Sequence, residues 1–394
     1  MPRCHDLSRS FVALDQGSTL IAVIEMSRMS WLVGALVPGL ERDPLKKLEP
    51  DAAGLLALLH RWRDAAEQAG GQVRRIAVAY EAGRDGFWLA RWLKDQGIEC
   101  YVIHASSIAV SREHRRAKTD RLDAALLKRA FLGWLRGEKD HCRMAAIPTV
   151  AEEDARCPHR EREVLVGERT RLINRLKSAL VRFDLSTLAL GRATSPRRLE
   201  QWLSEHGHAL PPHELARFRR GIARLRLIGT QIAEIEADRL ARIGSQRDPM
   251  AVDGKAVERV RALASWKGLG LPTADLIDCE VLCRNLPDRR AVARYGGLTG
   301  APDESGAKRR EKGLAKAGNA RVRHAMIQFA WRFLMFQKDS ALAKWYRLRT
   351  EHAGKTMRKV MIVALARKLL IALWRFATTG MVPQGVVLSA PAQP

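Results

Sequence analysis

Carboxylates with a spacing suited to metal binding are the first chemically informative feature of the sequence. Asp120 and Asp123 stand three residues apart in the segment AKTDRLDAALL, inside a run of arginines and lysines. On a helix this spacing places both side chains on one face, with Cβ atoms about 5 to 6 Å apart. Because two carboxylates so close together repel each other, the pattern favours a bound cation, with an ordinary solvated helix face as the alternative.

Two further acids are expected at the ends of strands. Asp15 follows the apolar run FVAL, and Glu81 ends the run RRIAVAYE. If all four acids meet in one cleft, a pair of Mg2+ ions about 3.5 to 4 Å apart would cancel their repulsion and support phosphodiester chemistry. The alternative for each acid is a turn residue or a surface ion pair. We predict that Asp15, Glu81, Asp120 and Asp123 are catalytic metal ligands.

A serine hydroxyl is the second candidate for chemistry. Ser305 stands beside a glycine in the segment APDESGAKRREKG, directly before a dense basic run. A serine activated by a base or a metal could attack a phosphodiester held by the neighbouring basic side chains. The alternative is a Ser-Gly turn that leads into a nucleic-acid-binding strand or helix. The histidines have no spacing that indicates a catalytic triad.

The charge of the chain indicates a polyanionic partner. The 394 residues include 68 Lys and Arg against 43 Asp and Glu, a net charge of +25. Residues 1–100 carry 13 of each sign, so the whole excess lies in the remainder of the chain. Such a charge attracts polyphosphates and releases their counterions, so nucleic acid is the expected partner and an anionic membrane surface the alternative. The predicted nucleic-acid-binding residues are Arg115, Arg116, Lys118, Arg121, Lys308, Arg309, Arg310, Lys312, Lys316, Arg321 and Arg323.

Hydropathy and cysteine content narrow the class of protein. The longest apolar run, WLVGALVPGL, is too short to span a bilayer, and Arg367 and Lys368 interrupt the apolar stretch near the C-terminus. We therefore expect no membrane association. The six cysteines form no CxxC pair, which favours reduced thiols in a cytoplasm over a zinc or disulfide framework.

The elements that would position the acids indicate an α/β domain over residues 1–145. Predicted strands FVALD, TLIAVIE and SWLVGALV are followed by a helix over 50–69, the strand RRIAVAYE, a second helix and the strand IECYVIH. This order describes a mixed sheet flanked by helices, and residues 104–136 are expected to continue as a helix that carries Asp120 and Asp123.

The remainder of the chain is expected to be mainly helical. Residues 146–250 contain two long amphipathic helices, which predict a helical hairpin or coiled coil, either a spacer or an oligomerisation arm. Residues 251–394 would form a third domain, which contains the serine and the basic region. Within it, SWKGLGLP predicts a helix, turn and helix, which could face a phosphate or be an ordinary connection.

Four segments carry a resemblance to a known family. They are LDQGSTLIAVIE, YEAGRDGFWLARWLKDQGIECYVIHAS, RRAKTDRLDAALL and YGGLTGAPDESGAKRREKGLAKAGNARVRHAMIQFAW. In this order they resemble the DEDD transposases of insertion sequences, also described as bridge-RNA-guided serine recombinases. The resemblance implies an RNase H-like (RuvC-like) domain with the acidic tetrad at Asp15, Glu81, Asp120 and Asp123, a coiled coil, and Ser305 in a helical transposase domain. The chain departs from the family at Lys267, where proline is common, and in LDQGS, where Asp-Val-Ser-Lys is frequent.

The same resemblance implies a mechanism and partners. Ser305 would attack a DNA phosphate to give a covalent phosphoserine, with Mg2+ at the tetrad polarising the phosphate. Expected partners are the DNA of the element ends and target, a structured noncoding guide RNA, and further copies of the chain in a dimer or tetramer, near the nucleoid of a bacterial cytoplasm. The competing functions are a RuvC-type nuclease that uses the tetrad alone and a nonenzymatic RNA- or DNA-binding protein.

Overall fold

The computed structural model describes residues 10, 12–83, 86–104, 107–108, 119–138, 141–183, 195–244, 254–284, 286–305, 308–315 and 317–389, with the backbone alone for 254, 302–305 and 308–312. The chain forms two compact units. The first contains residues 1–150 with 284–291, and the second contains residues 151–283 with 292–394. The division into residues 1–145, 146–250 and 251–394 stays a prediction about separately folding domains.

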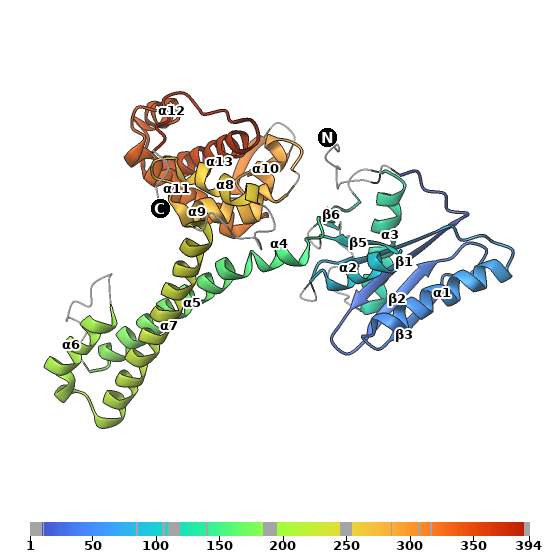
Figure 1. Cartoon of the computed structure of the whole chain (residues 1–394), viewed down its shortest axis with the longest axis horizontal. Helices are drawn as coiled ribbons and strands as arrows, with labels where there is room; N and C mark the ends of the chain where they lie inside the picture. Colours follow the sequence, from blue (N-terminus) through green and yellow to red (C-terminus); the bar gives the residue numbers. More distant parts are fainter. Residues whose placement is uncertain are drawn as a thin grey trace. The chain divides into compact units, whose positions relative to one another are not determined.

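The first unit is built on a six-stranded mixed sheet in the order β3-β2-β1-β4-β5-β6 (Figure 1). Its strands are β1 (Thr19–Met26), β2 (Trp31–Leu36), β3 (Leu45–Leu48), β4 (Arg75–Glu81), β5 (Glu99–Ile103) and β6 (Met144–Ala145). β1, β2 and β3 form an antiparallel meander, β4 pairs parallel to β1, and β5 pairs parallel to β4. The predicted mixed α/β architecture is confirmed.

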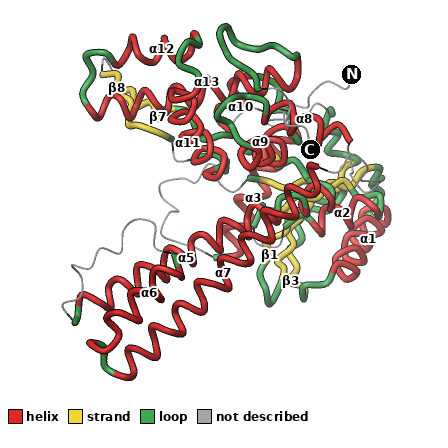
Figure 2. The backbone as a smooth tube through the Cα atoms, turned by 60° about the vertical axis from the view of Figure 1, so that its left-hand side comes forward, coloured by secondary structure: helices red, strands yellow, loops and turns green. Residues whose placement is uncertain are grey.

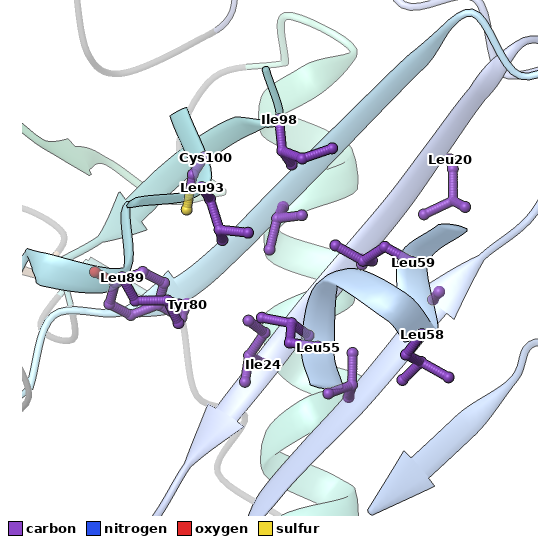
Figure 3. Packing of buried hydrophobic residues seen from close by; sticks show 14 of the residues in the cluster. Leu20, Ile24, Leu55, Leu58, Leu59, Tyr80, Leu89, Leu93, Ile98 and Cys100 are labelled. Atoms are coloured by element: carbon purple, nitrogen blue, oxygen red, sulfur yellow. The ribbon is translucent and has the colours of Figure 1, made fainter. Parts of the chain in front are cut away.

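Helices cover both faces of this sheet. On one face, Leu20 and Ile24 of β1 share a buried cluster with side chains of α1 (Ala52–Gln68) and α2 (Trp88–Asp95) (Figure 3). On the other face, Ile21 and Val23 share a cluster with α3 (Asp120–Leu135). Because successive strand residues point to opposite faces, the odd-numbered residues of β1 face α3.

Two sequence predictions in the first unit are wrong. Residues 13–15 are not in a strand, and the first strand of the sheet begins at Thr19. Both edges of β1 are already paired, with β2 and β4, so the sheet leaves no central position for the preceding apolar run. The second error concerns the helix expected over 104–136. Residues 105–106 and 109–118 lie outside the described residues, and among the described ones 104 and 119 are not helical. α3 begins at Asp120 because the Thr119 hydroxyl accepts a hydrogen bond from the backbone N–H of Leu122 at 3.3 Å and caps the helix.

A helical hairpin forms one part of the second unit. After α4 (Val150–Asp154), α5 (Cys157–Val181) packs against α7 (Pro212–Gly244), with α6 (Pro196–His206) beside their connected ends (Figure 2). Ion pairs join Arg162 to Glu236 at 2.7 Å and Arg182 to Glu214 at 2.9 Å, so the two long helices are antiparallel. The predicted pair of amphipathic helices is confirmed.

The rest of the second unit is mainly helical and contains one β-hairpin. Its helices are α8 (Gly254–Ala264), α9 (Leu271–Ile277), η3 (Asp278–Leu282), α10 (Arg289–Tyr295), α11 (Ala320–Phe336), α12 (Ala341–Thr350) and α13 (Lys355–Thr379). Its strands are β7 (Gly300–Ser305) and β8 (Lys308–Leu314). The first turn of α10 belongs to the first unit. Gly268 and Gly270 in the predicted turn have φ values of 98° and 74°. The left-handed conformation that only glycine adopts readily therefore forms beside Lys267. No described helix combines the length and apolar character needed to cross a membrane.

Candidate acidic site and nucleic-acid interface

Three of the four predicted acids lie at one end of the sheet. Glu81 is the last residue of β4 and is exposed. Ala77 and Ala79 of β4 pack in the cluster with α3. Every second side chain of a strand points to the same face, so Glu81 also faces that helix. Asp120 and Asp123 occupy the first turn of α3.

The orientation of α3 places its first turn over the end of β4 that carries Glu81. The backbone N–H of Ser10 donates to the carbonyl of Trp134 at 3.0 Å, and the Gln16 amide lies 2.8 and 3.0 Å from two nitrogens of Arg136. The C-terminal end of α3 is therefore held beside the segment that leads into β1. Since a helix of 16 residues is about 24 Å long, the first turn lies towards the opposite end of β1 and of its parallel neighbour β4.

The two aspartates also project from the side of α3 that meets the sheet. Asp123, Leu127 and Phe131 follow at steps of four residues, and the latter two are buried in the cluster shared with β1 and β4. Asp120 precedes Asp123 by three residues, so it lies on the same side. Both carboxylates thus lie on the sheet-facing side of α3, just beyond the apolar core. Asp120 is exposed and Asp123 is half-buried.

The start of α3 also reduces the cost of placing two carboxylates together. The unpaired backbone N–H groups of a first helical turn give it a partial positive charge, which favours anions there. The Thr119 cap described above fixes this turn. A helix N-terminus alone does not define a metal site, but it explains locally why the sequence tolerates the Asp-x-x-Asp pair.

Asp15 lies at the other end of the sheet. The carbonyl of Ser18 accepts hydrogen bonds from the backbone N–H groups of Arg74 and Arg75 at 2.8 and 3.2 Å, so the loop of Asp15 adjoins the beginning of β4. The seven residues of β4 put about 20 Å between that beginning and Glu81.

The carboxylate of Asp15 is engaged within its own turn. One oxygen accepts from the Gly17 N–H at 3.0 Å and the other accepts from the Ser18 hydroxyl at 2.6 Å. The hydrogen bonds from Ser18 and then Gly17 lower the pKa of Asp15 below its usual range. These contacts are those of a turn residue.

A further acid lies near the end of β1. Glu25 is the next-to-last residue of β1, whose C-terminal end lies beside that of the parallel strand β4. A signal for it exists in the sequence, because Glu25 continues the alternation of Ile21 and Val23 in TLIAVIE. The alternation alone could not show which face or which neighbour Glu25 meets.

Ser305 ends β7, and the basic run follows it directly as β8. In the hairpin Ser305 pairs with Lys308, Glu304 with Arg309, and Asp303 with Arg310. Lys312 lies further along the same strand, and Arg121 is exposed in the first turn of α3 beside the two aspartates. The predicted contacts Arg115, Arg116, Lys118 and Lys316 lie outside the described residues.

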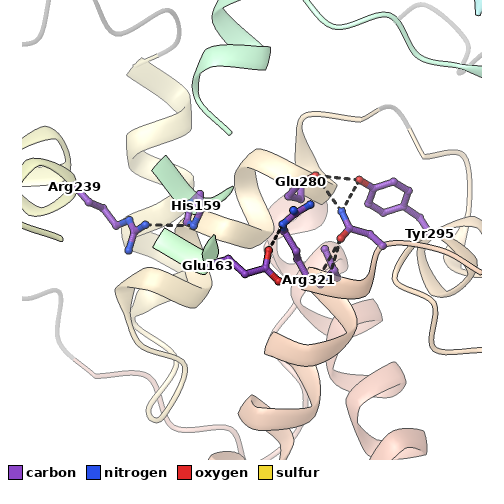
Figure 4. Close-up of polar contacts among 8 residues, drawn as sticks. His159, Glu163, Arg239, Glu280, Tyr295 and Arg321 are labelled. Atoms are coloured by element: carbon purple, nitrogen blue, oxygen red, sulfur yellow. Dashed lines mark hydrogen bonds and ion pairs between the residues drawn. The ribbon is translucent and has the colours of Figure 1, made fainter. Parts of the chain in front are cut away.

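Two predicted nucleic-acid contacts have protein partners in the second unit. Arg321, in the first turn of α11, forms an ion pair with Glu163 of α5 (Figure 4). Arg323 donates to the carbonyl of Ala317 at 3.3 Å. Both arginines therefore help to hold the start of α11 in place, and their contribution to nucleic-acid binding stays a prediction.

Hydrogen bonds from the half-buried side chain of Asn319 fix the segment that joins β8 to α11. The Asn319 side-chain oxygen caps α11 by accepting from the N–H groups of Arg321 and Val322 at 3.0 and 3.3 Å. Its amide nitrogen donates to the carboxylate of buried Glu280 and to the hydroxyl of Tyr295, both at 3.0 Å (Figure 4). The position of the chain after the basic hairpin is therefore set by the helical core.

A second cluster in this unit has the residue types of a metal site. Among the residues that the structure describes, His159, Asp275 and Cys279 are the three whose potential ligand atoms lie within 4.8 Å of one another. The acids at the Glu81 end are not gathered as closely. However, Asp275 is already paired with Arg239 at 3.0 Å and Arg242 at 2.8 Å.

The chemistry of the His159 cluster favours a structural role. Burial raises the pKa of the Cys279 thiol, which disfavours the thiolate that a metal would bind. Two guanidinium groups on the carboxylate of Asp275 would also repel a cation. The cluster instead ties α9 to both long helices of the hairpin, through His159 of α5 and through Arg239 and Arg242 of α7.

Comparison with known proteins identifies the family. Residues 43–183 match the model of the IS110 group of DEDD transposases, described as "Transposase", and residues 260–347 match the model described as "Transposase IS116/IS110/IS902 family". The chain is 38% identical over 384 residues to "Putative transposase y4rJ" of Sinorhizobium fredii (strain NBRC 101917 / NGR234), which covers 96% of this chain and 97% of the relative. It is 27% identical over 338 residues to "Putative transposase y4qE" of the same strain, which covers 84% and 76%. The chain therefore belongs to the IS110 family of DEDD transposases.

Proposed function

We propose that this transposase exchanges DNA strands through a covalent bond between Ser305 and DNA, assisted by Mg2+ at the acidic end of the sheet. The observation that carries the proposal is the gathering of Glu81, Asp120 and Asp123 at one end of β4 and α3. The DEDD family implies a divalent metal ion, and an all-carboxylate donor set suits a hard cation such as Mg2+. When bound, the ion would neutralise these carboxylates and polarise a phosphate oxygen.

In the proposed reaction the Ser305 hydroxyl oxygen attacks a phosphodiester phosphorus. A bond forms between the serine oxygen and phosphorus, the bond from phosphorus to one deoxyribose oxygen breaks, and that sugar leaves as a free hydroxyl. The proton of the serine passes to a base, and the leaving oxygen takes up a proton. Because the product is again a phosphodiester, attack by a hydroxyl of a second DNA end restores Ser305 and joins the new strand without an energy source.

The basic side chains and the helical hairpin supply the proposed partners. DNA of the element ends and target would lie along the residues of β8 and the start of α3, where Lys308, Arg309 and Arg121 can contact phosphates. We propose that a structured noncoding RNA pairs with both DNAs and so selects the sites. The hairpin of α5 and α7 is proposed as the arm through which two or four chains assemble.

The covalent intermediate gives the most direct test. Full-length protein incubated with element DNA, guide RNA and Mg2+ is expected to yield a protein–DNA adduct that survives denaturing electrophoresis. Ser305→Ala should abolish the adduct while retaining DNA binding, since only the nucleophilic oxygen is removed. DNA cleavage without any adduct in the unmodified protein would contradict the proposal and favour a nuclease that uses water at the acidic site. An adduct that persists in Ser305→Ala would also overturn the role of Ser305.

Salt dependence tests the proposed phosphate contacts. If the chain neutralises six to ten phosphates, DNA affinity should fall about 10³- to 10⁵-fold between 50 and 200 mM salt. Fluorescence anisotropy with a labelled DNA duplex would measure this slope. Lys308→Ala should reduce the slope by about one phosphate contact, whereas an unchanged slope would show that this lysine does not contact DNA.

A further inference from the structure

We propose that the outer sides of α12 and α13 bind single-stranded DNA, with a base stacked on Trp345 and phosphates held by the surrounding lysines and arginines. The proposal rests on DNA as the substrate of the family and is independent of the serine and metal chemistry proposed above. The family model that matches this unit ends at residue 347, so most of the surface lies beyond it. The surface contains none of the residues that the sequence predicted to bind nucleic acid.

Positive charge is concentrated in these two helices. Residues 341–379 contain nine lysines and arginines and one acid, Glu351, which is about a third of the net charge of the chain in about a tenth of its length. All nine are exposed, and among the residues that the structure describes none of them forms an ion pair with a carboxylate. They are Lys344, Arg347, Arg349, Lys355, Arg358, Lys359, Arg367, Lys368 and Arg375. An uncompensated basic surface of this density attracts a polyanion.

The outer side of α12 combines charge with exposed apolar groups. Ala343, Tyr346 and Thr350 form the buried side of this helix. Trp345, which is half-buried, and Leu348, which is 77% exposed, project away from that side. Both apolar side chains therefore stand in solvent among basic neighbours.

The outer side of α13 has the same mixed character. Lys368 and Arg375 are two helical turns apart and so lie on one side of the helix, and the exposed Arg367 adjoins them. Met357 and Val360, earlier on the helix, are 52% and 54% exposed. Basic side chains suit the phosphates of a nucleic acid, and apolar side chains suit the faces of unpaired bases.

The indole ring of Trp345 is where the two helices bring their charges together. α12 packs against α13 (Figure 1). The Lys368 Nζ atom of α13 lies 4.7 Å from the ring centroid, and the Arg349 Cζ atom, one turn further along α12, lies 5.6 Å from it. Two like charges repel each other, and a phosphate placed between them would contact both and offset that repulsion.

The same contacts leave the ring available to a base. Cation–π contacts at exposed sites are weak, and both cations end long, exposed side chains. Lys368 and Arg349 can therefore turn from the ring to a phosphate and uncover a face of the indole. A base can stack on that face only when it is not already stacked within a duplex, so the ligand is a single strand.

An anionic membrane surface is the competing partner. Helices that lie in a membrane interface also combine basic residues with exposed apolar side chains, but they use their main apolar side to contact lipid. In α13 that side is already packed in the protein, through residues that include Leu365, Leu369 and Leu373. The burial of this side favours DNA over lipid.

Binding of a fluorescent oligothymidylate to the full-length protein, followed by anisotropy, tests the stacking site. Trp345→Leu is expected to weaken binding about 5- to 150-fold, because it removes the aromatic face. Trp345→Phe should recover most of the affinity, since it keeps an aromatic ring. A duplex of the same length should lose no more than about twofold in Trp345→Leu, because its bases are already stacked.

Matched lysine variants test the phosphate contacts. Lys368→Gln should lower the slope of log affinity against log salt for the single strand by about 0.7. Lys46→Gln, at an exposed position of β3, removes one positive charge elsewhere and should leave both slope and affinity unchanged. If Lys368→Gln behaves like Lys46→Gln, the proposed phosphate contact is overturned.

The measurements separate this surface from the proposed strand exchange. They are made in EDTA, where no divalent ion contributes, and Ser305→Ala should bind the single strand as tightly as the unmodified protein. Loss of the adduct in Ser305→Ala with no effect of Trp345→Leu would overturn the stacking site alone. Weakened single-strand binding in Trp345→Leu, with no adduct in the unmodified protein, would support the stacking site and overturn the covalent mechanism.

Two further readouts guard against a structural role for Trp345. An iodouracil-substituted DNA strand, cross-linked by light to the unmodified protein and mapped by mass spectrometry, should label Trp345, and labels confined to other elements would overturn the proposal. Thermal unfolding should agree between Trp345→Phe and the unmodified protein. A loss of binding that Trp345→Phe shares, together with a lower unfolding temperature, would indicate a structural role.

The alternative ligands give distinct outcomes. Tighter binding of an oligouridylate than of the DNA strand, abolished in Trp345→Leu, would assign the surface to RNA and overturn the choice of DNA. Loss of binding to phosphatidylserine vesicles in Trp345→Leu, with DNA binding unchanged, would assign it to a membrane. Equal weakening of single-strand and duplex binding in Trp345→Leu would overturn base stacking.

Discussion

Asp120→Asn is expected to lower the rate of strand exchange by at least about a hundredfold. Asp120 is a proposed metal ligand, and amide substitution would remove its charge. Loss of a residue that only hydrogen-bonds to a metal ligand already costs about 10- to 100-fold. The measurement is single-turnover recombination of element DNA at saturating Mg2+, quantified by the joined product. Under the proposed mechanism, the adduct with Ser305 should decrease in parallel.

The fold should survive this substitution. Asp120 is exposed in the first turn of α3, where its favourable interaction with the helix N-terminus is worth about 0.3 to 1 kcal/mol. The matched control is Arg121→Gln at the next position, which should weaken DNA binding modestly and leave metal binding unchanged. Full strand-exchange activity in Asp120→Asn would argue against catalysis by a metal at this site.

Asp275→Ala is expected to lower the free energy of unfolding of the second unit by about 3 to 5 kcal/mol. Asp275 is buried and is the shared partner of His159, Arg239 and Arg242. Removing one partner of a buried ionic cluster leaves the others uncompensated in a poorly solvated place. Urea unfolding followed by tryptophan fluorescence would measure the effect, since the second unit contains the buried Trp266.

A surface pair gives the contrast for Asp275. Glu236→Gln breaks the exposed pair with Arg162, which should cost no more than about 1 kcal/mol. If both variants changed stability by the same small amount, the ionic cluster would not be what secures α9 to the hairpin.

The ion pairs of Asp275 are also expected to make the protein less stable at acidic pH. Burial opposes ionisation of Asp275, but His159 and the charges of Arg242 and Arg239 outweigh it and lower its pKa below the usual value. Burial lowers the pKa of Arg239 more than Asp275 raises it, yet a guanidinium keeps its proton far above neutral pH, so the pair stays ionised. Because the folded pKa of Asp275 is depressed, its contribution is complete above the ordinary aspartate pKa and is lost as the pH falls through the folded value. In Asp275→Ala this part of the acid destabilisation should be absent.

Hydropathy and helix spacing determined much of the architecture. The apolar runs TLIAVIE, SWLVGALV and RRIAVAYE predicted β1, β2 and β4, because a strand buried on both faces requires nearly continuous apolar residues. The repeated leucines of the middle segment predicted the two long helices, since a stripe at helical spacing must pack against another such stripe. The Asp120 and Asp123 pair was also readable, because their relation is set within one helical turn.

The tertiary structure alone decided which distant acids meet. FVALD and TLIAVIE both have local patterns suited to a strand that ends in an acid, and only the pairing of β1 with β2 and β4 selects the second as the centre of the sheet. The burial of Asp275 between His159 and two arginines was equally invisible, because these partners come from helices far apart in the chain. Local sequence sets periodicity and capping, whereas the neighbours across a sheet or between helices depend on chain pairing, which no single segment encodes.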